Sequence, residues 1–208
     1  MIYVFLGIQG SGKGTQAKLL SKHLELVHIT LGDRFRQQIT EGTKLGKEAK
    51  KYLSKGHLVP DDMVFEVVEE IFENKKKGFV FDGFPRTLAQ AEYLSEKHPI
   101  QKVFYLQLDD EIARARMLSR RICSKCKKDY NLLVKAPKID SICDVCGAEI
   151  VKRHDDTDEL INKRLELFHN ETTPLIDYYK KLNLLETLEA DQDINQIHQE
   201  IINIINKD

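Results

Sequence analysis

Residues 1–15 read Met1-Ile2-Tyr3-Val4-Phe5-Leu6-Gly7-Ile8-Gln9-Gly10-Ser11-Gly12-Lys13-Gly14-Thr15. The apolar run over residues 2–6 predicts a buried strand, and helical spacing over residues 14–23 places the glycine-rich loop between that strand and a helix. Glycines let such a loop turn tightly with its N–H groups inward, and the helix N-terminus adds partial positive charge. Lys13 supplies a full charge. The stretch predicts a loop that wraps phosphate groups; a glycine-rich turn without a ligand is the alternative.

The rest of the chain alternates between short apolar runs and helical patterns. Strands are predicted at residues 2–6, 78–81, 102–108 and 184–188, and helices with charged outer faces at residues 14–23, 61–74, 88–96, 111–121 and 158–181. A final helix at residues 194–205 is expected to pack on the sheet, with a partner-binding helix as the alternative. Such alternation favours a parallel sheet covered on both faces. We therefore predict an α/β fold of the P-loop type, with three layers.

Two segments fit this alternation poorly. Residues 30–59 have helical spacing but no strand of their own, and we expect them to form an insertion on the rim of the sheet. Residues 122–157, here called the cysteine module, are rich in Lys, Cys, Asp and Pro and lack a long periodic pattern. The predicted core is thus built from residues 1–29, 60–121 and 158–208.

The cysteine module holds all four cysteines, as two C-x₂-C pairs: Cys123 with Cys126, and Cys143 with Cys146. Each pair can wrap one side of a tetrahedral ion, and the chain between them is long enough for a small antiparallel hairpin. We expect a structural Zn²⁺ with no open position for catalysis; iron is the competing metal, and two disulfides are the alternative.

Composition excludes some partners and favours one compartment. The chain has 208 residues, of which 41% are hydrophobic and 31% charged, as in globular proteins. Lys and Arg number 32 against 33 Asp and Glu, so no global field draws the chain to nucleic acid or anionic lipid. The first residues show no basic leader and no apolar stretch of signal-peptide length, and reduced cysteines suit a cytoplasmic location.

A second motif, Val80-Phe81-Asp82-Gly83-Phe84-Pro85-Arg86-Thr87, ends the second predicted strand. Asp82, at the carboxyl end of a parallel strand beside the phosphate loop, is well placed to hold the water shell of Mg²⁺. Arg86 offers a planar fork that can grip a phosphate in two places. The alternative is a structural turn with a surface salt bridge.

Gly12-Lys13-Gly14-Thr15 and the motif at residues 82–87 resemble the nucleoside monophosphate kinases, and the adenylate kinases in particular, over nearly the whole chain. That family usually has Pro where this chain has Gln9, a departure that we expect to change loop stiffness more than chemistry. The resemblance implies ATP binding by Gly10, Ser11, Gly12, Lys13, Gly14, Thr15, Arg116, Arg120, Asp129, Tyr130 and Gln192. It implies AMP binding by Leu31, Arg36, His57, Leu58, Val59, Gly83, Phe84, Pro85, Arg86, Gln90, Arg153 and Arg164.

The resemblance also implies a mechanism. Phosphoryl transfer needs positioning and charge neutralisation more than a base, and the residues expected to supply the charge are Lys13, Arg86, Arg120, Arg153 and Arg164. Arg116 and Arg120 are predicted to share one helix face. Asp155 and Asp156 are expected to hold the arginines in an empty site.

The expected reaction is the reversible Mg²⁺-dependent conversion of ATP and AMP into two ADP. The expected enzyme is a cytoplasmic monomer in which residues 30–59 bind AMP and the cysteine module closes as a lid. A GTP donor or a UMP or CMP acceptor is the nearer alternative. A nucleic-acid-binding zinc ribbon on an ATPase is the distant one, although the module contains only one Tyr, Phe or Trp residue, Tyr130.

Overall fold

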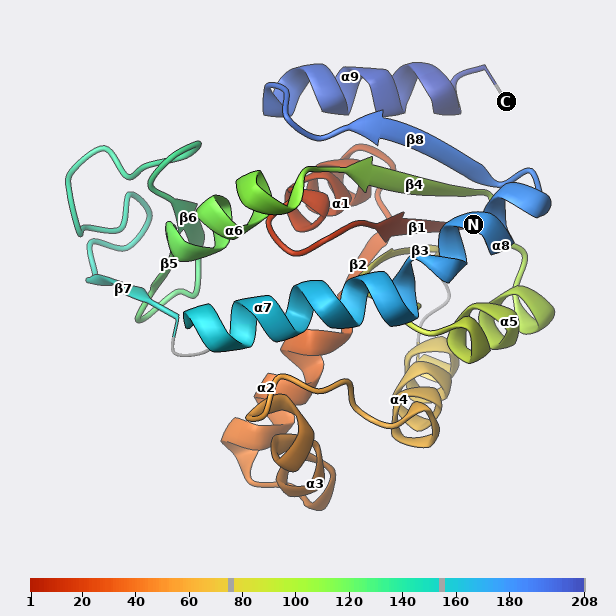
Figure 1. The fold of residues 1–208 in the computed structure, drawn as a ribbon, viewed down its shortest axis with the longest axis horizontal. Helices are drawn as coiled ribbons and strands as arrows, with labels where there is room; N and C mark the ends of the chain where they lie inside the picture. Colours follow the sequence, from red (N-terminus) through yellow and green to blue (C-terminus); the bar gives the residue numbers. More distant parts are fainter. Residues whose placement is uncertain (75–76, 154–155, 208) are drawn as a thin grey trace.

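The computed structural model describes residues 1–74, 77–153 and 156–207. Its centre is a sheet of five parallel strands in the order β2-β3-β1-β4-β8 (Figure 1). Every residue of the central strand is buried, as expected for a strand covered on both faces. The strands are β1 (Ile2–Leu6), β2 (Val27–Thr30), β3 (Phe79–Asp82), β4 (Lys102–Gln107) and β8 (Leu185–Glu189).

Helices cover both faces of the sheet. Side chains of β1 that alternate along the strand point to opposite faces. Phe5 packs with α1 (Lys13–His23) and α9 (Ile194–Ile205), whereas Val4 packs with the other helical layer. That second layer consists of α4 (Asp61–Asn74), α5 (Leu88–Lys97) and α8 (Pro174–Lys181). The three-layer α/β prediction is therefore confirmed.

The edge strand β2 was not among the four predicted strands. It has only four residues, and just one of them, Ile29, is fully buried. A strand this short and half exposed leaves no pattern that distinguishes it from a loop. The structure corrects the predicted count from four strands to five.

Two predicted helices are not continuous over the ranges that their spacing suggested. Helix α6 (Asp110–Leu118) stops before Arg120, which instead begins strand β5 (Arg120–Cys123). The predicted helix at residues 158–181 is divided into α7 (Asp158–Leu167), a π-helical turn (Phe168–Thr172) and α8. Pro174 is the first residue of α8, a position where its missing N–H costs no hydrogen bond.

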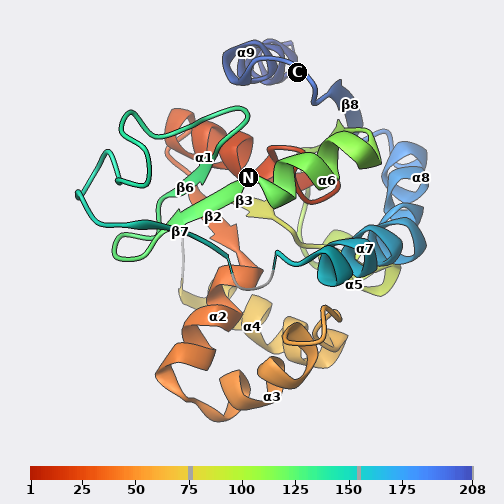
Figure 2. The ribbon, with the colours of Figure 1, turned by 60° about the vertical axis from the view of Figure 1, so that its left-hand side comes forward.

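The insertion after β2 forms two helices, α2 (Leu31–Glu41) and α3 (Lys44–Leu53), which stand away from the sheet in Figures 1 and 2. Gly46 of α3 lies directly against the backbone of α2. A Cβ added at Gly46 would lie 2.1 Å from Gln38 O. The close approach of the two helices therefore requires glycine at this position.

The cysteine module contains a small sheet of its own, with β5 paired antiparallel to β6 (Asp129–Asn131) and to β7 (Ile150–Lys152). This sheet is separate from the five-stranded sheet and lies to one side of it in Figure 1. Three strands replace the single hairpin that the sequence suggested. In the part of the chain that the structure describes, no helix has the length and apolar character needed to span a membrane.

Candidate active site

The phosphate loop, residues 7–15, connects the end of β1 to α1. Gly12 caps α1 with a φ of 88°, a conformation that side chains with a Cβ rarely adopt. Lys13 Nζ donates to Ile8 O at 3.1 Å, which folds the lysine back over the loop. Burial lowers the pKa of Lys13 to about 8. An anion bound beside the lysine would raise this pKa again, because a nearby negative charge favours the protonated form.

The loop also holds a buried hydroxyl. Ser11 is 1% exposed, and its Oγ accepts and donates no hydrogen bond within the described residues. Because unpaired buried hydroxyls are costly and uncommon in folded proteins, Ser11 Oγ is a suitable partner for a phosphate oxygen.

Asp82 explains why glycine follows Lys13. A Cβ at Gly14 would lie 2.8 Å from Asp82 Oδ2, so the Ser or Thr that usually follows the lysine of such loops would not fit here without displacing the carboxylate. Asp82 ends β3 opposite Phe5 of β1, which places the carboxylate beside the loop. On its other side, His28 Nε2 lies 3.9 Å from Asp82 Oδ2.

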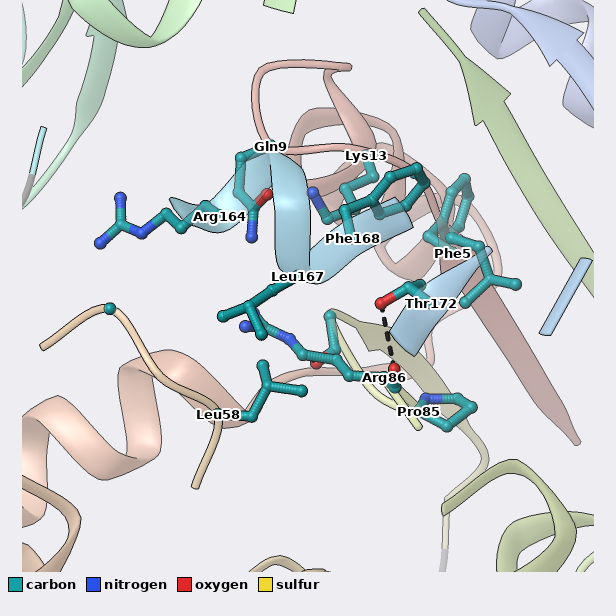
Figure 3. Close-up of a pocket in the computed structure, with 14 residues that line it drawn as sticks. Phe5, Gln9, Lys13, Leu58, Pro85, Arg86, Arg164, Leu167, Phe168 and Thr172 are labelled. Carbon is teal, nitrogen blue, oxygen red and sulfur yellow. Dashed lines mark hydrogen bonds between the residues drawn. The ribbon is translucent and has the colours of Figure 1, made fainter. Parts of the chain in front are cut away.

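Arg86 lies across the cavity from Lys13 (Figure 3). Its Nε donates to Gly83 O at 2.8 Å, and Thr172 Oγ1 donates to its carbonyl oxygen at 3.0 Å. Burial lowers the pKa of Arg86. The negative charge of Asp82 opposes this shift, whereas the positive charge of Arg164 adds to it. Several cations therefore surround one small volume.

That volume is a cavity of about 450 Å³, part of which is open to solvent. Its walls come from four segments far apart in the chain, at residues 5–13, 56–58, 83–86 and 164–172. Lys13 and Arg86 both line it, so the phosphate loop and the motif at residues 82–87 face the same space. Two separate cavities for these residues would have excluded a site shared by two phosphate groups.

Asp156 holds two of the arginines. Arg120 donates to both of its carboxylate oxygens, at 2.8 and 2.6 Å, and Arg164 Nη1 donates to Oδ1 at 3.2 Å. Asp156 has no exposed surface, so this shared carboxylate is shielded from water. The expectation that an acidic residue holds the arginines is confirmed for Asp156; Asp155 lies outside the described residues.

The other predicted lid residues lie close to these arginines. Burial raises the pKa of Asp129, and the positive charges of Arg153 and Arg120 oppose this rise. All three charged groups therefore lie near one another. The prediction that Arg116 and Arg120 share a helix face was wrong, because α6 ends before Arg120. Arg116 instead turns to the end of β8 and donates to Ala190 O at 3.0 Å.

A second and more open hollow lies beside Arg116, and its space of about 680 Å³ includes open solvent. Leu133 and Val134 of the cysteine module form its far wall, and Asp191 accepts from Arg116 Nη2 at 2.7 Å. Gln192 is exposed beside it. A planar cation facing aliphatic side chains suits a flat aromatic ligand such as a base.

The predicted AMP-site residues fall into two groups. Arg36 is partly exposed and paired with Asp33 of its own helix, and Leu58 and Pro85 line the cavity. The second group consists of residues whose side chains lie in the hydrophobic core and not in the cavity. They are Leu31 (4% exposed), Phe84 (0%) and Val59 (6%). The contacts with AMP predicted for these three residues therefore concern their backbone atoms.

His57 and Gln90 are already engaged within the chain. His57 Nε2 lies 2.9 Å from Lys163 Nζ of α7. Gln90 is 3% exposed; its Oε1 accepts from Arg86 N at 2.8 Å and its Nε2 donates to Asp61 Oδ1 at 2.6 Å.

The four cysteine sulfurs form a compact group within 4.8 Å of one another. Sulfurs around a tetrahedral Zn²⁺ are separated by about 3.8 Å, given Zn–S bonds of about 2.3 Å. The Sγ atoms of Cys123 and Cys146, and those of Cys126 and Cys143, are 3.5 Å apart. All four thiols are free, which rules out the alternative of two disulfides. The donor set fits a four-coordinate metal ion.

The side chain of Tyr130 is packed against this cysteine cluster. It is 3% exposed, its hydroxyl donates to Cys143 Sγ at 3.3 Å, and Asp144 N donates to the hydroxyl oxygen at 2.8 Å. The hydrogen bond that the Tyr130 hydroxyl donates lowers the pKa of Cys143 to about 6, and this favours the thiolate form that a metal requires. The predicted ATP contact of Tyr130 stays a prediction, and it concerns the backbone of this residue, since the side chain is 3% exposed.

Two features of the site were missed in the sequence, and one of them lies in the cavity wall. Gln9 lines the cavity near Lys13 and Arg164 (Figure 3), and its Oε1 is buried without a partner among the described residues. Its side chain therefore adds a polar atom to the wall of the cavity. Asp61 was missed because nothing in its local sequence relates it to Gln90; only the fold brings them together.

Two cationic sites that share one cavity are what phosphoryl transfer requires, because donor and acceptor phosphates must meet away from water. Fold and site together define a P-loop phosphotransferase. The model of the adenylate kinase family matches residues 5–184. Similar proteins include the adenylate kinases of Caldicellulosiruptor bescii (43% identical over 97% of each chain) and Thermosipho africanus (42% over all of each chain). A third, from Clostridium tetani, is 41% identical over 99% of this chain and 98% of its own. The chain belongs to the adenylate kinase family.

Proposed function

We propose that this enzyme catalyses the reversible transfer of the γ-phosphoryl group of Mg·ATP to AMP, giving two ADP. The observation that carries the proposal is the single cavity lined by both Lys13 and Arg86. A loop suited to one set of phosphates and a half-buried arginine suited to another face each other there. Donor and acceptor can therefore meet end to end.

The donor site consists of the phosphate loop and the hollow beside Arg116. The backbone N–H groups of residues 10–15 and Lys13 bind the β- and γ-phosphates, and Arg116 stacks on the base against Leu133 and Val134. Asp129 and the backbone near Gln192 complete the donor side. Asp82 holds the water shell of the Mg²⁺ that accompanies ATP.

The acceptor site lies on the opposite wall. Arg36 and Arg86 bind the AMP phosphate, residues 57–59 lie against the base, and the Gln90 carboxamide hydrogen-bonds it. Arg120, Arg153 and Arg164 neutralise charge on the moving phosphoryl group. No strong base is required, because the AMP phosphate is already ionised.

The two insertions close over this site. Residues 30–59 form the AMP-binding part and residues 122–157 form the lid, which excludes water and so prevents ATP hydrolysis. Zn²⁺ held by the four cysteines stabilises the lid, which has too little apolar mass to fold alone. We also propose a cytoplasmic monomer: free thiolates suit a reducing compartment, and one chain supplies every cation named here.

A pair of arginine substitutions tests the proposal. Arg86→Ala should lower the rate of ADP formation at least 100-fold, the scale of losing a charged group at the transferring phosphate, while the unfolding transition is unchanged in cooperativity. Arg34→Ala, which removes an exposed arginine of α2, serves as the matched control. Equal activities in the two variants would remove Arg86 from the acceptor site. A coupled assay across GTP, UMP and CMP checks the nucleotide choice.

A further inference from the structure

The carboxamide of Gln90 is held by groups that accept only one of its two orientations. Arg86 N donates to Oε1, and Nε2 donates to Asp61 Oδ1. A backbone N–H can only donate and a carboxylate can only accept. The oxygen of Gln90 must therefore face Arg86, and its nitrogen must face Asp61.

Asp61 is itself fixed in place. It is the first residue of α4, and the Thr87 hydroxyl donates to its carboxylate, with oxygen separations of 3.2 and 3.1 Å. The same hydroxyl accepts from Gln90 N at 3.2 Å as the N-cap of α5. The carboxylate is thus positioned against the very turn that carries Gln90.

A flipped carboxamide would be costly in this environment. Its oxygen would lie against the Asp61 carboxylate, and its NH₂ group would lie against the Arg86 N–H. Gln90 is 3% exposed, so water cannot relieve either contact.

Each end of the amide keeps one unused bonding position, a lone pair on Oε1 and a hydrogen on Nε2. With its orientation fixed, the amide offers the base one acceptor and one donor in defined places. Adenine presents a matching amino group and an unprotonated N1. A 6-oxopurine presents the reverse pattern, a carbonyl group and an N1–H, and would need the reverse amide.

We propose that Asp61 is a specificity-determining residue, which selects adenine over 6-oxopurine monophosphates by locking the Gln90 carboxamide in one orientation. The inference rests on the proposed function, which supplies the contact between Gln90 and the acceptor base. Asp61 acts through Gln90 and needs no contact with substrate.

Inosine monophosphate is the probe, because it differs from AMP chiefly in this hydrogen-bond pattern. In Asp61→Asn the new amide can donate or accept, so one of the two constraints on Gln90 is lost. The ratio of kcat/KM for AMP to that for IMP should fall roughly tenfold, the scale of a hydrogen bond to a charged group. The KM for ATP should not change.

Asp62→Asn is the matched control, since it removes the same charge from the exposed neighbouring position of the same helix end; it should keep the wild-type ratio. An unchanged ratio in Asp61→Asn overturns the inference. Asp61→Ser, whose hydroxyl can also donate or accept, gives the same test if the amide variant does not fold.

Gln90→Ala separates this inference from the proposed function. Retention of the AMP preference in Gln90→Ala would show that Gln90 does not contact the base, and the acceptor site itself would be wrong. Loss of the preference in Gln90→Ala, together with a wild-type ratio in Asp61→Asn, would reject only the lock.

Discussion

Substituting Gly46 by alanine should destabilise the protein, although the same change inside a helix ordinarily stabilises it. Helix propensity alone favours alanine by about 1 kcal/mol. At this position, however, the new Cβ would meet backbone atoms of α2, at 2.1 Å from Gln38 O and 2.5 Å from Ile39 N. Backbone cannot rotate aside as a flexible side chain would, so the whole helix pair has to respond.

The size of that response follows from the contact distances. Ordinary contacts of a Cβ begin near 3.4 Å, so α2 and α3 must separate by about 1 Å in a close-packed interface. Overpacking of this kind costs about 1–3 kcal/mol, and three backbone atoms in the way favour the upper part of that range. After the gain in propensity, we expect the free energy of unfolding to fall by about 2 kcal/mol. The melting temperature should fall by about 4–8 °C.

Thermal and urea unfolding of the full chain measure this change, and steady-state kinetics measure its effect on the site. Because α2 carries Arg36, the KM for AMP should rise while the KM for ATP stays unchanged. Lys47→Gly, at the exposed neighbouring position of α3, isolates the propensity contribution within the same turn. A Gly46→Ala protein as stable as the wild type would refute the close approach of the two helices.

Three further predictions concern the charged residues and the proposed zinc site. Asp156→Asn should lower the free energy of unfolding by about 2–3 kcal/mol, less than a fully buried pair because Arg120 and Arg164 remain partly exposed; urea unfolding within 0.5 kcal/mol of wild type, roughly the scale of surface substitutions, would contradict this. Chelation of the metal should lower the melting temperature yet leave ATP bound by the phosphate loop, and complete loss of nucleotide binding in a titration would count against a purely structural ion. Burial holds the pKa of Lys13 at about 8 in the fold, below its ordinary value of 10.5, so its protonated form destabilises the empty enzyme. The free energy of unfolding should therefore rise as the pH increases from 8 to 10.5. ATP binding should take up protons in that window, measurable by calorimetry in two buffers, and Lys13→Met should abolish the uptake if the lysine is its source.

The phosphate loop and the motif at residues 82–87 could be predicted from the sequence, because the residues that characterise each of them are contiguous in the chain. A loop of residues 7–15 carries its own glycines, lysine and helix start, so local rules suffice to place it. The cysteine pairs have the same advantage, since each C-x₂-C unit sets its own geometry.

Side-chain direction was less predictable, because tertiary packing decides it. Tyr130 is the only Tyr, Phe or Trp in the cysteine module, and a domain this small must bury it to have a core at all. Arg116 and Arg120 are separated by one helical turn in sequence, but the helix ends between them and they diverge. Asp61 and Gln90 are 29 residues apart, and their contact depends on how α4 and α5 pack.

The carboxylate of Asp156 also limits which anions the empty enzyme can retain. A small ion such as inorganic phosphate must compete with a fixed negative group already bonded to two of the guanidiniums. A ligand that spans Lys13 and Arg86 as well has enough contacts to win that competition. We therefore expect the enzyme to discriminate between anions by molecular length, with small anions acting as poor inhibitors of nucleotide binding.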